Sequence, residues 1–533
     1  MFKRTVAIFF AVCFTLGVMC SRMAKIILTS DSSAASSRNS ISVIADTSRG
    51  MIYDCNMEPL VQTEAQTYIA LKPELSAYGE YSGYIPDSYR EEVFEAVSSG
   101  KIALCPSLGE TDGRDAVSFT LKKRYCDNGL CVHLVGYTDS SGGVCGIEKY
   151  YDGILSSASG NIKAVCSIDA LRRPLKGEAL KIENNGYLSP AGVQLTIDTR
   201  IQKICEDALE EFGFVRGAVA VVEVGTGEIK ALVSVPEFNQ NDVSKSLDDD
   251  NSPFVFRAIM PYSVGSVFKP VVAAAALESG IPTSLSYTCE GSYKIGENCF
   301  GCHKHEGHGT LDMYGGMSQS CNPYFINLAL MTGADRICEM GERLGLGRRT
   351  ELCDGWYAGN GNMPSSEELV SPQDLANLAF GQGTLLASPL QMAAVYAAFA
   401  DGGVYRAPVL MKAVIDSGRN AVMTAEPPAP RRVMKQSTAQ TVSSLLLGTV
   451  NSGSGNRAQC DYCSVAGKTA TAQSGQFKNG SVEITQSWFC GFFPYDAPKY
   501  SVAILKEDGD GGSLDCAPVF KYIADGIYGQ GIL

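Results

Sequence analysis

The segment 266–281 constrains the fold most, because its stretch 271–277 is apolar on nearly every side of a helix. A helix without a polar face has to be covered all round, so this segment predicts a buried helix at the centre of a domain. Pro270 lacks an amide hydrogen and is tolerated in a helix only in the first turn, which places the helix start close to Ser266.

Ser266 and Lys269 are three residues apart at the head of this helix and therefore share one of its faces. A serine hydroxyl is a weak nucleophile and needs an adjacent base. Burial at the positive end of a helix lowers the pKa of a lysine, which makes Lys269 a candidate base. The same helix end offers a backbone N–H to a developing oxyanion. Because S-x-x-K is a common tetrapeptide, a capped helix with a surface lysine is the ordinary alternative.

Two later segments strengthen the catalytic interpretation. They are Ser320-Cys321-Asn322, which precedes a helical pattern, and Lys468-Thr469-Ala470-Thr471, which lies in a small-residue strand after Gly467. Each is weak alone, since a serine-x-asparagine is usually a cap or turn and the second segment fits an edge strand. Together, in this order, they match the set S-x-x-K, S-x-N and K-T-G.

The larger, C-terminal part of the chain, 186–533, predicts an α/β (α+β) domain. Segment 202–209 and the apolar segment 388–402 predict helices. Strand-like runs lie at 193–198, 218–224, 229–235, 465–472, 488–493 and 500–506. Because strands stand at both ends with helices between them, we expect an antiparallel sheet that joins the two ends and is flanked by helices around the buried central helix.

Residues 29–185 predict a separate, mixed and mostly β domain behind a serine-rich linker at 29–40. Residues 117–121 alternate apolar and polar side chains, as a half-buried strand does. Residues 132–135 predict a second strand, and Asp127-Asn128-Gly129 between the two is typical of a hairpin turn.

The N-terminus predicts a membrane segment over 1–28. Lys3 and Arg4 precede an apolar run at 6–20, which is short for a bilayer span of about 17–25 residues and has the length and charge of a signal-peptide core. We expect an uncleaved, single-pass anchor with its N-terminus in the cytoplasm and the bulk of the chain outside the cell membrane. A cleaved signal peptide and a lipoprotein attached at Cys20 are the alternatives. The net charge of −13 argues against nucleic acid as a partner.

At this point the chain resembles the class B penicillin-binding proteins, which are monofunctional peptidoglycan D,D-transpeptidases. We expect class B because no glycosyltransferase-like unit precedes the motifs. Beyond the three motifs, further segments match the family pattern in order: Arg49-Gly50-Met51-Ile52-Tyr53-Asp54, Gly146-Ile147-Glu148, Leu195-Thr196-Ile197-Asp198, Gly227-Glu228-Ile229, Gly381-Gln382-Gly383, Ser388-Pro389-Leu390-Gln391-Met392, Ser487-Trp488-Phe489 and Gly491-Phe492. The resemblance implies that 29–185 is a non-catalytic pedestal and 186–533 the transpeptidase domain.

The resemblance implies a role for each motif residue. Ser266 would attack the carbonyl of a D-Ala–D-Ala stem peptide, and Lys269 would take the serine proton. Ser320 and Asn322 would continue the proton path and hold the substrate amide. Lys468 would support Ser320 electrostatically and help to bind the terminal carboxylate.

The family pattern also implies the surroundings of the acyl-enzyme. Thr469 and Thr471 would line the strand that pairs with substrate, and Thr471 would bind the carboxylate. The backbone N–H groups of Ser266 and Thr471 would form the oxyanion hole. An amine from a neighbouring stem would resolve the ester into a crosslink, and β-lactams would acylate the same serine. No cofactor is needed for this acyl transfer, and a polytopic glycan polymerase is the implied partner.

Ala470 departs from the family pattern, which has glycine at this position. With a period of two along a strand, Ala470 shares a face with Lys468. The added methyl group could narrow the cleft and weaken binding of substrate or β-lactam, while it removes no reacting group. We therefore expect retained activity.

The cysteines and histidines leave several interpretations open. Cys299, Cys302, His305 and His308 have residue types and spacing of a zinc site, but ligands three apart in so short a stretch seldom close a tetrahedron unaided, and we expect no metal. A disulfide of Cys289 with Cys299 or Cys302, or free thiols, are the alternatives. Cys321 is expected to be a small packed residue. The pairs Cys126–Cys131 and Cys460–Cys463 could form local disulfides.

Three other activities compete with transpeptidation. Water could resolve the acyl-enzyme, as in a D,D-carboxypeptidase or β-lactamase, although the long pedestal and the anchor oppose both. A catalytically weak wall-binding scaffold is favoured only by Ala470. A β-lactam sensor needs an internal signalling domain, for which the four residues before the anchor leave no room.

Overall fold

The computed structural model describes residues 2–29, 39–127, 129–478 and 481–533, and it divides into two compact units. The first unit comprises 1–49, 62–124 and 159–189, and the second comprises 50–61, 125–158 and 190–533. Two stretches that the sequence assigned to the pedestal, 50–61 and 125–158, therefore pack within the second unit. Most of the expected linker and the expected turn residue Asn128 lie outside the described residues.

The first unit is mostly β, as expected. One sheet has the order β1-β8-β9, from β1 (Ser40–Ser48), β8 (Gly160–Ser167) and β9 (Lys181–Asn185). The other has the order β4-β3-β5, from β3 (Glu64–Leu71), β4 (Ala103–Pro106) and β5 (Ala116–Lys123), which confirms the strand predicted at 117–121. Apolar side chains from both sheets, including Phe119 and Ile162, form one cluster. Helices α3 (Leu75–Tyr81) and α4 (Arg90–Ser98) are the main helices of this region.

The N-terminal segment forms one long helix, α1 (Phe2–Thr29). Its stretch from Arg4 to Lys25 is 22 residues long with a mean hydropathy of 2.0, enough by length and composition to cross a membrane. A signal sequence near an N-terminus has the same properties.

The strand predicted at 132–135 is wrong. These residues form a short helix, α5 (Val132–Val135), entered through Cys131 in the left-handed conformation with φ 62°. All four side chains are buried. A short run that is buried at every residue fits a helical turn as well as a strand, so the residue pattern does not separate the two.

The second unit is built on a five-stranded antiparallel sheet with the order β12-β11-β27-β26-β25. Strands β11 (Gly217–Glu223) and β12 (Ile229–Val235) come early in the chain, whereas β25 (Ala466–Lys478), β26 (Val482–Phe493) and β27 (Tyr500–Glu507) come late. The sheet therefore joins the two ends of the domain, as the sequence predicts. Strand β25 forms one edge of it.

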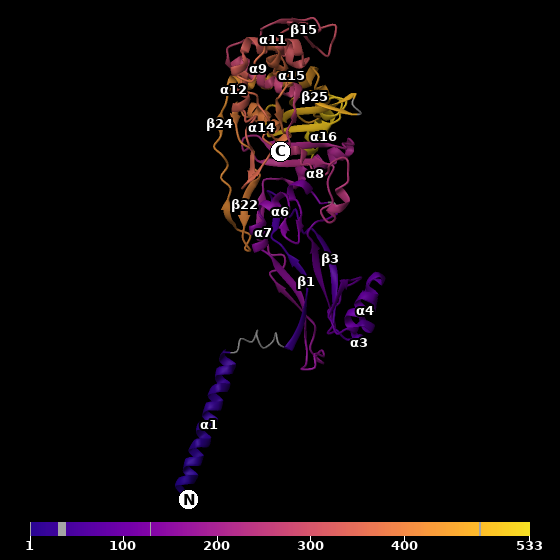
Figure 1. The fold of residues 1–533 in the computed structure, drawn as a ribbon, viewed down its shortest axis with the longest axis vertical. Helices are drawn as coiled ribbons and strands as arrows, with labels where there is room; N and C mark the ends of the chain where they lie inside the picture. The colour runs from indigo at the N-terminus through magenta and orange to yellow at the C-terminus, as the bar shows by residue number, and fades with distance from the viewer. Residues whose placement is uncertain (1, 30–38, 128, 479–480) are drawn as a thin grey trace. The chain divides into compact units, whose positions relative to one another are not determined.

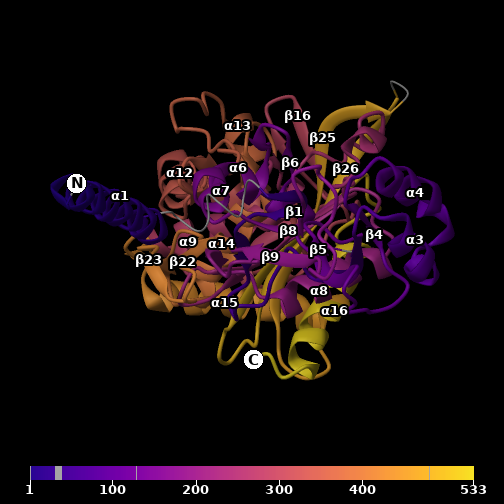
Figure 2. The ribbon, with the colours of Figure 1, turned by 90° about the horizontal axis from the view of Figure 1, so that it is seen from below.

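Helices cover both faces of this sheet. Helices α8 (Thr199–Glu211) and α16 (Cys516–Gly529) lie next to one another on one face (Figure 1 and Figure 2), where Phe489 and Phe520 pack in a common apolar cluster. Helix α14 (Pro389–Ala400) packs on the other face, and its capping box of Ser388 and Gln391 fixes its start. Because side chains alternate along a strand, each face contributes its own apolar layer.

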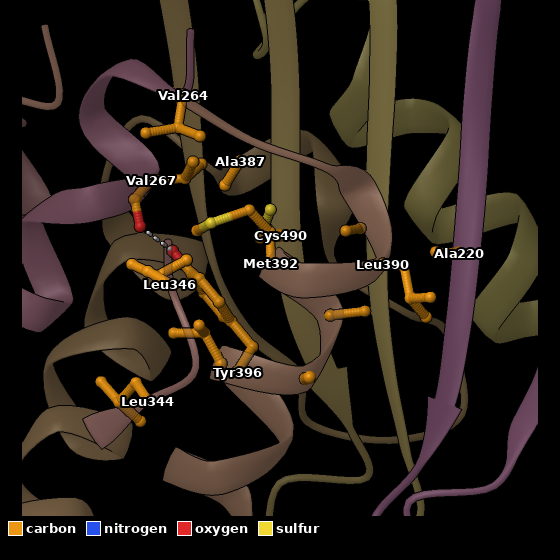
Figure 3. Close-up of a cluster of buried hydrophobic side chains, with 14 of the residues drawn as sticks. Ala220, Val264, Val267, Leu344, Leu346, Ala387, Leu390, Met392, Tyr396 and Cys490 are labelled. Carbon is orange, nitrogen blue, oxygen red and sulfur yellow. Dashed lines mark hydrogen bonds between the residues drawn. The ribbon is translucent and has the colours of Figure 1, made fainter. Parts of the chain in front are cut away.

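The predicted central helix is α9 (Lys269–Glu278), whose residues 269–276 are all buried. Helices α10 (Met313–Ser318), α11 (Asn322–Thr332), α12 (Ala334–Arg343) and α15 (Gln436–Ser452) pack around it. A short 3-10 turn, η6 (Gly265–Phe268), precedes it and carries Ser266. Figure 3 shows Tyr396 of α14 reaching this turn, where its hydroxyl donates to Val267 O at 3.0 Å.

Candidate active site

The turn that carries Ser266 is held by close backbone packing. Gly265 has φ 61°, in the left-handed region that glycine adopts without strain. Its amide donates to Gly381 O at 2.9 Å, and a Cβ built on Gly381 would lie 1.9 Å from Gly265 O. Only glycine therefore fits at 381, which gives a physical reason for glycine there in Gly381-Gln382-Gly383. The turn also packs against β25.

Lys269 is the first residue of α9, and its side chain is fully buried. Its Nζ donates to Ser320 O at 2.6 Å, to Asn322 Oδ1 at 2.8 Å and to Ser320 Oγ at 3.2 Å. The amine also lies 5.4 Å from the ring centroid of Phe325 on α11. All three hydrogen bonds of the Lys269 amine thus go to the S-x-N segment. Lys269 is therefore not a surface lysine on a capped helix.

Ser320 sits in a strained turn between α10 and α11, with φ 51°. A left-handed conformation costs a residue with a Cβ about 1–2 kcal/mol, so neighbouring contacts have to hold it. Asn322 begins α11, and its Nδ2 donates to Gly301 O at 3.2 Å. This bond ties the S-x-N turn to the chain that precedes Cys302.

Lys468 is also fully buried and points from the edge strand β25 toward the same serine. Its Nζ donates to Ser320 Oγ at 2.9 Å and to Thr469 O at 2.9 Å. Ser320 Oγ therefore lies within hydrogen-bond distance of two lysine amines, one from the central helix and one from the sheet.

Burial shifts the protonation of both amines. It lowers the pKa of Lys269 to about 7. It lowers the pKa of Lys468 well below the usual value, and the neighbouring Lys269 lowers it further because two like charges repel. At neutral pH a neutral amine is thus available on Lys269, three residues along the chain from Ser266, and a neutral amine is what general-base activation of a serine requires.

The other motif residues of β25 differ from Lys468 in the face of the strand they occupy or in their contacts. Thr469 points to the opposite face, where its Oγ1 bonds Ser454 Oγ at 3.0 Å, and Thr471 is exposed. Ala470 is buried on the Lys468 face, and a Cβ built on Gly265 would lie 3.3 Å from the Ala470 Cβ. The extra methyl group thus packs toward the turn behind the nucleophile.

The structure brings together a cysteine and histidine group that differs from the one the sequence singled out. The Sγ atoms of Cys289, Cys302 and Cys321 and a ring nitrogen of His308 all lie within 4.8 Å of one another. Cys299 and His305, the other two residues of the sequence-derived group, are exposed and outside it. Cys460 and Cys463 are free thiols, with their Sγ atoms 3.6 Å apart.

Comparison with known proteins identifies the class. Residues 217–525 match the family described as "Penicillin binding protein transpeptidase domain", and the chain belongs to this family. It is a class B member by its relatives. The peptidoglycan D,D-transpeptidase MrdA of Escherichia coli K12 is 25% identical over 593 residues, covering 96% of this chain and 92% of that protein.

Other relatives match this chain over only part of their own length. Stage V sporulation protein D of Bacillus subtilis is 29% identical over 410 residues, which cover 73% of this chain and 60% of that protein. MrdA of Haemophilus influenzae is 26% identical over 419 residues, covering 72% and 62%. The chain therefore spans less than two thirds of the length of these relatives.

Solved structures share the fold. The transpeptidase-domain structure from Eggerthella lenta has a TM-score of 0.65 and 27% identity, and covers 91% of this chain and 99% of that one. Penicillin-binding protein PBP2 of Helicobacter pylori has a TM-score of 0.69 at 22% identity, covering 93% and 100%, which shows the fold alone.

Replacing Gly381 with alanine tests the packing behind the nucleophile. We expect G381A to lower the free energy of unfolding by about 2–4 kcal/mol, because its Cβ collides with Gly265 O. Urea denaturation followed by tryptophan fluorescence reports on this unit, since Trp356 and Trp488 both lie in it. G383A is the matched control, because Gly383 also has a positive φ but its Cβ would meet only Asn377 Cβ, at 3.6 Å. Equal losses in the two variants would contradict the steric account.

Replacing Ala470 with glycine tests what the extra methyl group does. Since it is buried behind the turn, we expect A470G to lower the free energy of unfolding by about 1 kcal/mol. The rate of acylation by penicillin should stay within about threefold of wild type. A tenfold faster acylation in A470G would instead support the narrowed cleft.

Proposed function

We propose that this protein is a peptidoglycan D,D-transpeptidase that works through an acyl-enzyme on Ser266. The observation that carries the proposal is the placement of Ser320 Oγ within hydrogen-bond distance of two buried amines, at 3.2 Å from Lys269 and 2.9 Å from Lys468. This arrangement provides a base for attack and a relay for the leaving group. The names of the relatives, which include peptidoglycan D,D-transpeptidase, support the same chemistry.

In the first step, Ser266 Oγ attacks the carbonyl carbon of the penultimate D-alanine while its proton passes to the neutral amine of Lys269. The pKa of about 7 keeps a large share of this amine neutral at neutral pH. The backbone N–H groups of Ser266 and Thr471 hold the oxyanion that forms on the carbonyl oxygen.

In the second half of acylation, the carbon–nitrogen bond breaks and the terminal D-alanine leaves. Its amine takes the proton of the Ser320 hydroxyl. The lysines that contact Ser320 Oγ then return a proton to this oxygen. Lys468 and the exposed Thr471 bind the carboxylate of the leaving residue, and Asn322 orients the substrate amide. Thr469 supports the strand through Ser454 and does not face Lys468.

An amine from a neighbouring stem peptide then attacks the ester and regenerates the Ser266 hydroxyl. The four-membered ring of a β-lactam presents the same carbonyl to Ser266, and the ring opens without a leaving fragment that could diffuse away. β-Lactams are therefore covalent inhibitors. This acyl transfer needs neither a redox group nor a metal-bound water.

The cellular setting follows from α1 and from the relatives. We propose that α1 stays uncleaved as a single-pass anchor and that the rest of the chain lies outside the cytoplasm, where stem peptides are found. A homologous PBP2 of Helicobacter pylori has been solved in a complex with MreC. For this protein we propose a polytopic glycan polymerase as the partner that supplies uncrosslinked strands.

Fluorescent penicillin tests the nucleophile. The wild-type protein should be labelled, whereas S266A should show no label because the substitution removes the proposed nucleophile, and the remaining hydroxyl at Lys269, Ser320 Oγ, is assigned to proton relay. S279A is the matched control, since Ser279 caps the opposite end of the same helix, where its Oγ bonds Ala275 O. Labelling of S266A at the wild-type rate would disprove the proposal.

A stem pentapeptide with an amine acceptor separates the two enzyme activities. Crosslinked product from the wild-type protein is expected, and free tetrapeptide as the only product would identify a D,D-carboxypeptidase.

The pH dependence of acylation tests the base. Only the neutral amine accepts a proton, so the rate of penicillin acylation should rise about tenfold per pH unit below a midpoint near 7 and level off above it. The measurement is a series of stopped-flow labelling rates between pH 5 and 9, with the fold checked at each pH by tryptophan fluorescence. A rate that is constant across this range would exclude Lys269 as the base.

A further inference from the structure

We propose that the buried carboxylate of Asp515 positions strand β25, which makes Asp515 a positioning residue for acyl transfer at Ser266. Asp515 directly precedes helix α16 and follows the loop 508–514, and it belongs to none of the three catalytic motifs. The inference rests on the proposed function, because it concerns the strand that would hold the oxyanion and the carboxylate of the substrate.

Strand β25 needs support from outside the sheet. In the described part of the sheet it is the last strand in the order β12-β11-β27-β26-β25, so β26 pairs with it along one side. The other side has to stay open for a substrate chain, because an edge strand offers its free N–H and C=O groups to an added strand. An oxyanion donor has to be held within about 0.5 Å of its productive position. The backbone at Thr471 therefore requires a restraint that leaves the open edge free.

The loop that follows β27 supplies this restraint. A Cβ built on Gly512 would lie 2.5 Å from Ala470 O and closer still to Trp488 O, and these two residues face one another on β25 and β26. A Cβ built on Gly511 would lie 3.2 Å from Thr471 Oγ1. The loop backbone thus lies directly against Ala470 and Thr471, the part of β25 that carries the proposed oxyanion donor.

Asp515 joins this loop to the sheet. Its Oδ2 accepts hydrogen bonds from Gly511 N at 3.0 Å and from Ser487 Oγ at 2.7 Å, and its Oδ1 accepts one from Lys506 Nζ at 2.8 Å. Gly511 N also donates to Ser487 Oγ at 2.9 Å. Thr471, Ser487 and Lys506 face one another in register across β25, β26 and β27. One carboxylate thus binds two members of this row and, through Gly511, braces the third.

The carboxylate is buried and ionised. The side chain of Asp515 is 7% exposed. Burial raises the pKa of this carboxyl group, but the hydrogen bonds from Lys506 and Ser487 together outweigh burial and keep the pKa below its usual value. An ionised acceptor forms stronger hydrogen bonds than a neutral one. The loop is therefore held by a charged group that an uncharged side chain does not replace.

A helix cap is the ordinary role of an aspartate that precedes a helix. The side chain of Asp515 makes no capping hydrogen bond to α16. Its three hydrogen bonds reach β26, β27 and the loop instead. Asp515 N donates to Gly511 O at 2.9 Å, so backbone and side chain bind the same loop residue. The stability of α16 alone therefore does not explain where this carboxylate points.

Hydrogen–deuterium exchange of the full-length protein tests whether Asp515 holds the strand. In D515A, peptides that cover 466–473 should exchange about threefold faster or more, because the loop no longer braces β25. E223A is the matched control, since Glu223 has a side chain 10% exposed and pairs with Lys230 and Lys499, but lies in β11, which does not pair with β25. Unchanged exchange of 466–473 in D515A, or equal acceleration in E223A, would overturn the proposal.

Acylation by penicillin measures the consequence for catalysis. The limiting rate at saturating penicillin should fall about tenfold or more in D515A and stay at the wild-type value in E223A, because a displaced donor stabilises the oxyanion less well. The midpoint of the pH profile should stay near 7, since the contacts of Lys269 lie outside the loop. A purely structural role would lower stability and leave the limiting rate of the folded protein unchanged. That result, or a shifted midpoint with an unchanged plateau, would contradict positioning of the oxyanion strand.

The variant S487A guards against a D515A protein that does not fold. It keeps the carboxylate and removes the hydroxyl between Asp515 and Gly511 N, so the limiting rate should fall about threefold or more. An unchanged rate in folded S487A would overturn the proposal. If penicillin labels neither wild type nor variants although exchange of 466–473 depends on Asp515, the proposed function fails and the bracing of β25 stands.

Discussion

The burial of two lysine amines around one serine hydroxyl is the interaction on which the rest of this structure depends. Lys269 and Lys468 are fully buried and both reach Ser320 Oγ. An amine taken out of water is costly unless oxygen atoms replace the lost solvent, and here Asn322 Oδ1 and the carbonyls of Ser320 and Thr469 replace it. Burial and mutual repulsion then favour the neutral form of the amines. The desolvation that makes this burial costly therefore also makes an amine able to accept a proton at neutral pH.

That requirement explains why the domain is built around a helix with no polar face. Helix α9 carries Lys269 and is enclosed by α10, α11, α12 and α15, while the edge strand β25 presents Lys468 from the other side. The sheet that holds β25 combines strands from both ends of the domain. The glycines at 265 and 381 permit the close backbone contact that fixes the turn of Ser266 between helix and strand. The helix and the edge strand thus each place one lysine amine where water is excluded.

Much of the fold and of the site could be predicted from local pattern. The buried helix was recognisable because 271–277 has no polar face, and the strands of the five-stranded sheet were recognisable as short apolar runs. The catalytic residues could be found because their types and order are unusual together. The segment 132–135 was predicted wrongly, since four residues that are all buried, three of them apolar, show no periodicity that separates a strand from a helix. The pairing of Cys302 and His308 with Cys289 and Cys321 has no local signal either, because β14 (Tyr287–Cys289), β16 (Asn298–Gly301) and the cap of α11 are brought together only by folding.

The sequence by itself determined the chemistry available to this protein: a serine and a lysine on one helix face, an apolar helix that had to be buried, and an apolar N-terminal segment. These features depend on neighbours within one or two helical turns. Only the tertiary structure decided that two amines share one hydroxyl, that Ala470 packs behind the nucleophile, and that residues 50–61 and 125–158 fold with the second unit. Such choices depend on contacts between distant segments, where desolvation and steric fit act on groups that the chain order does not place side by side.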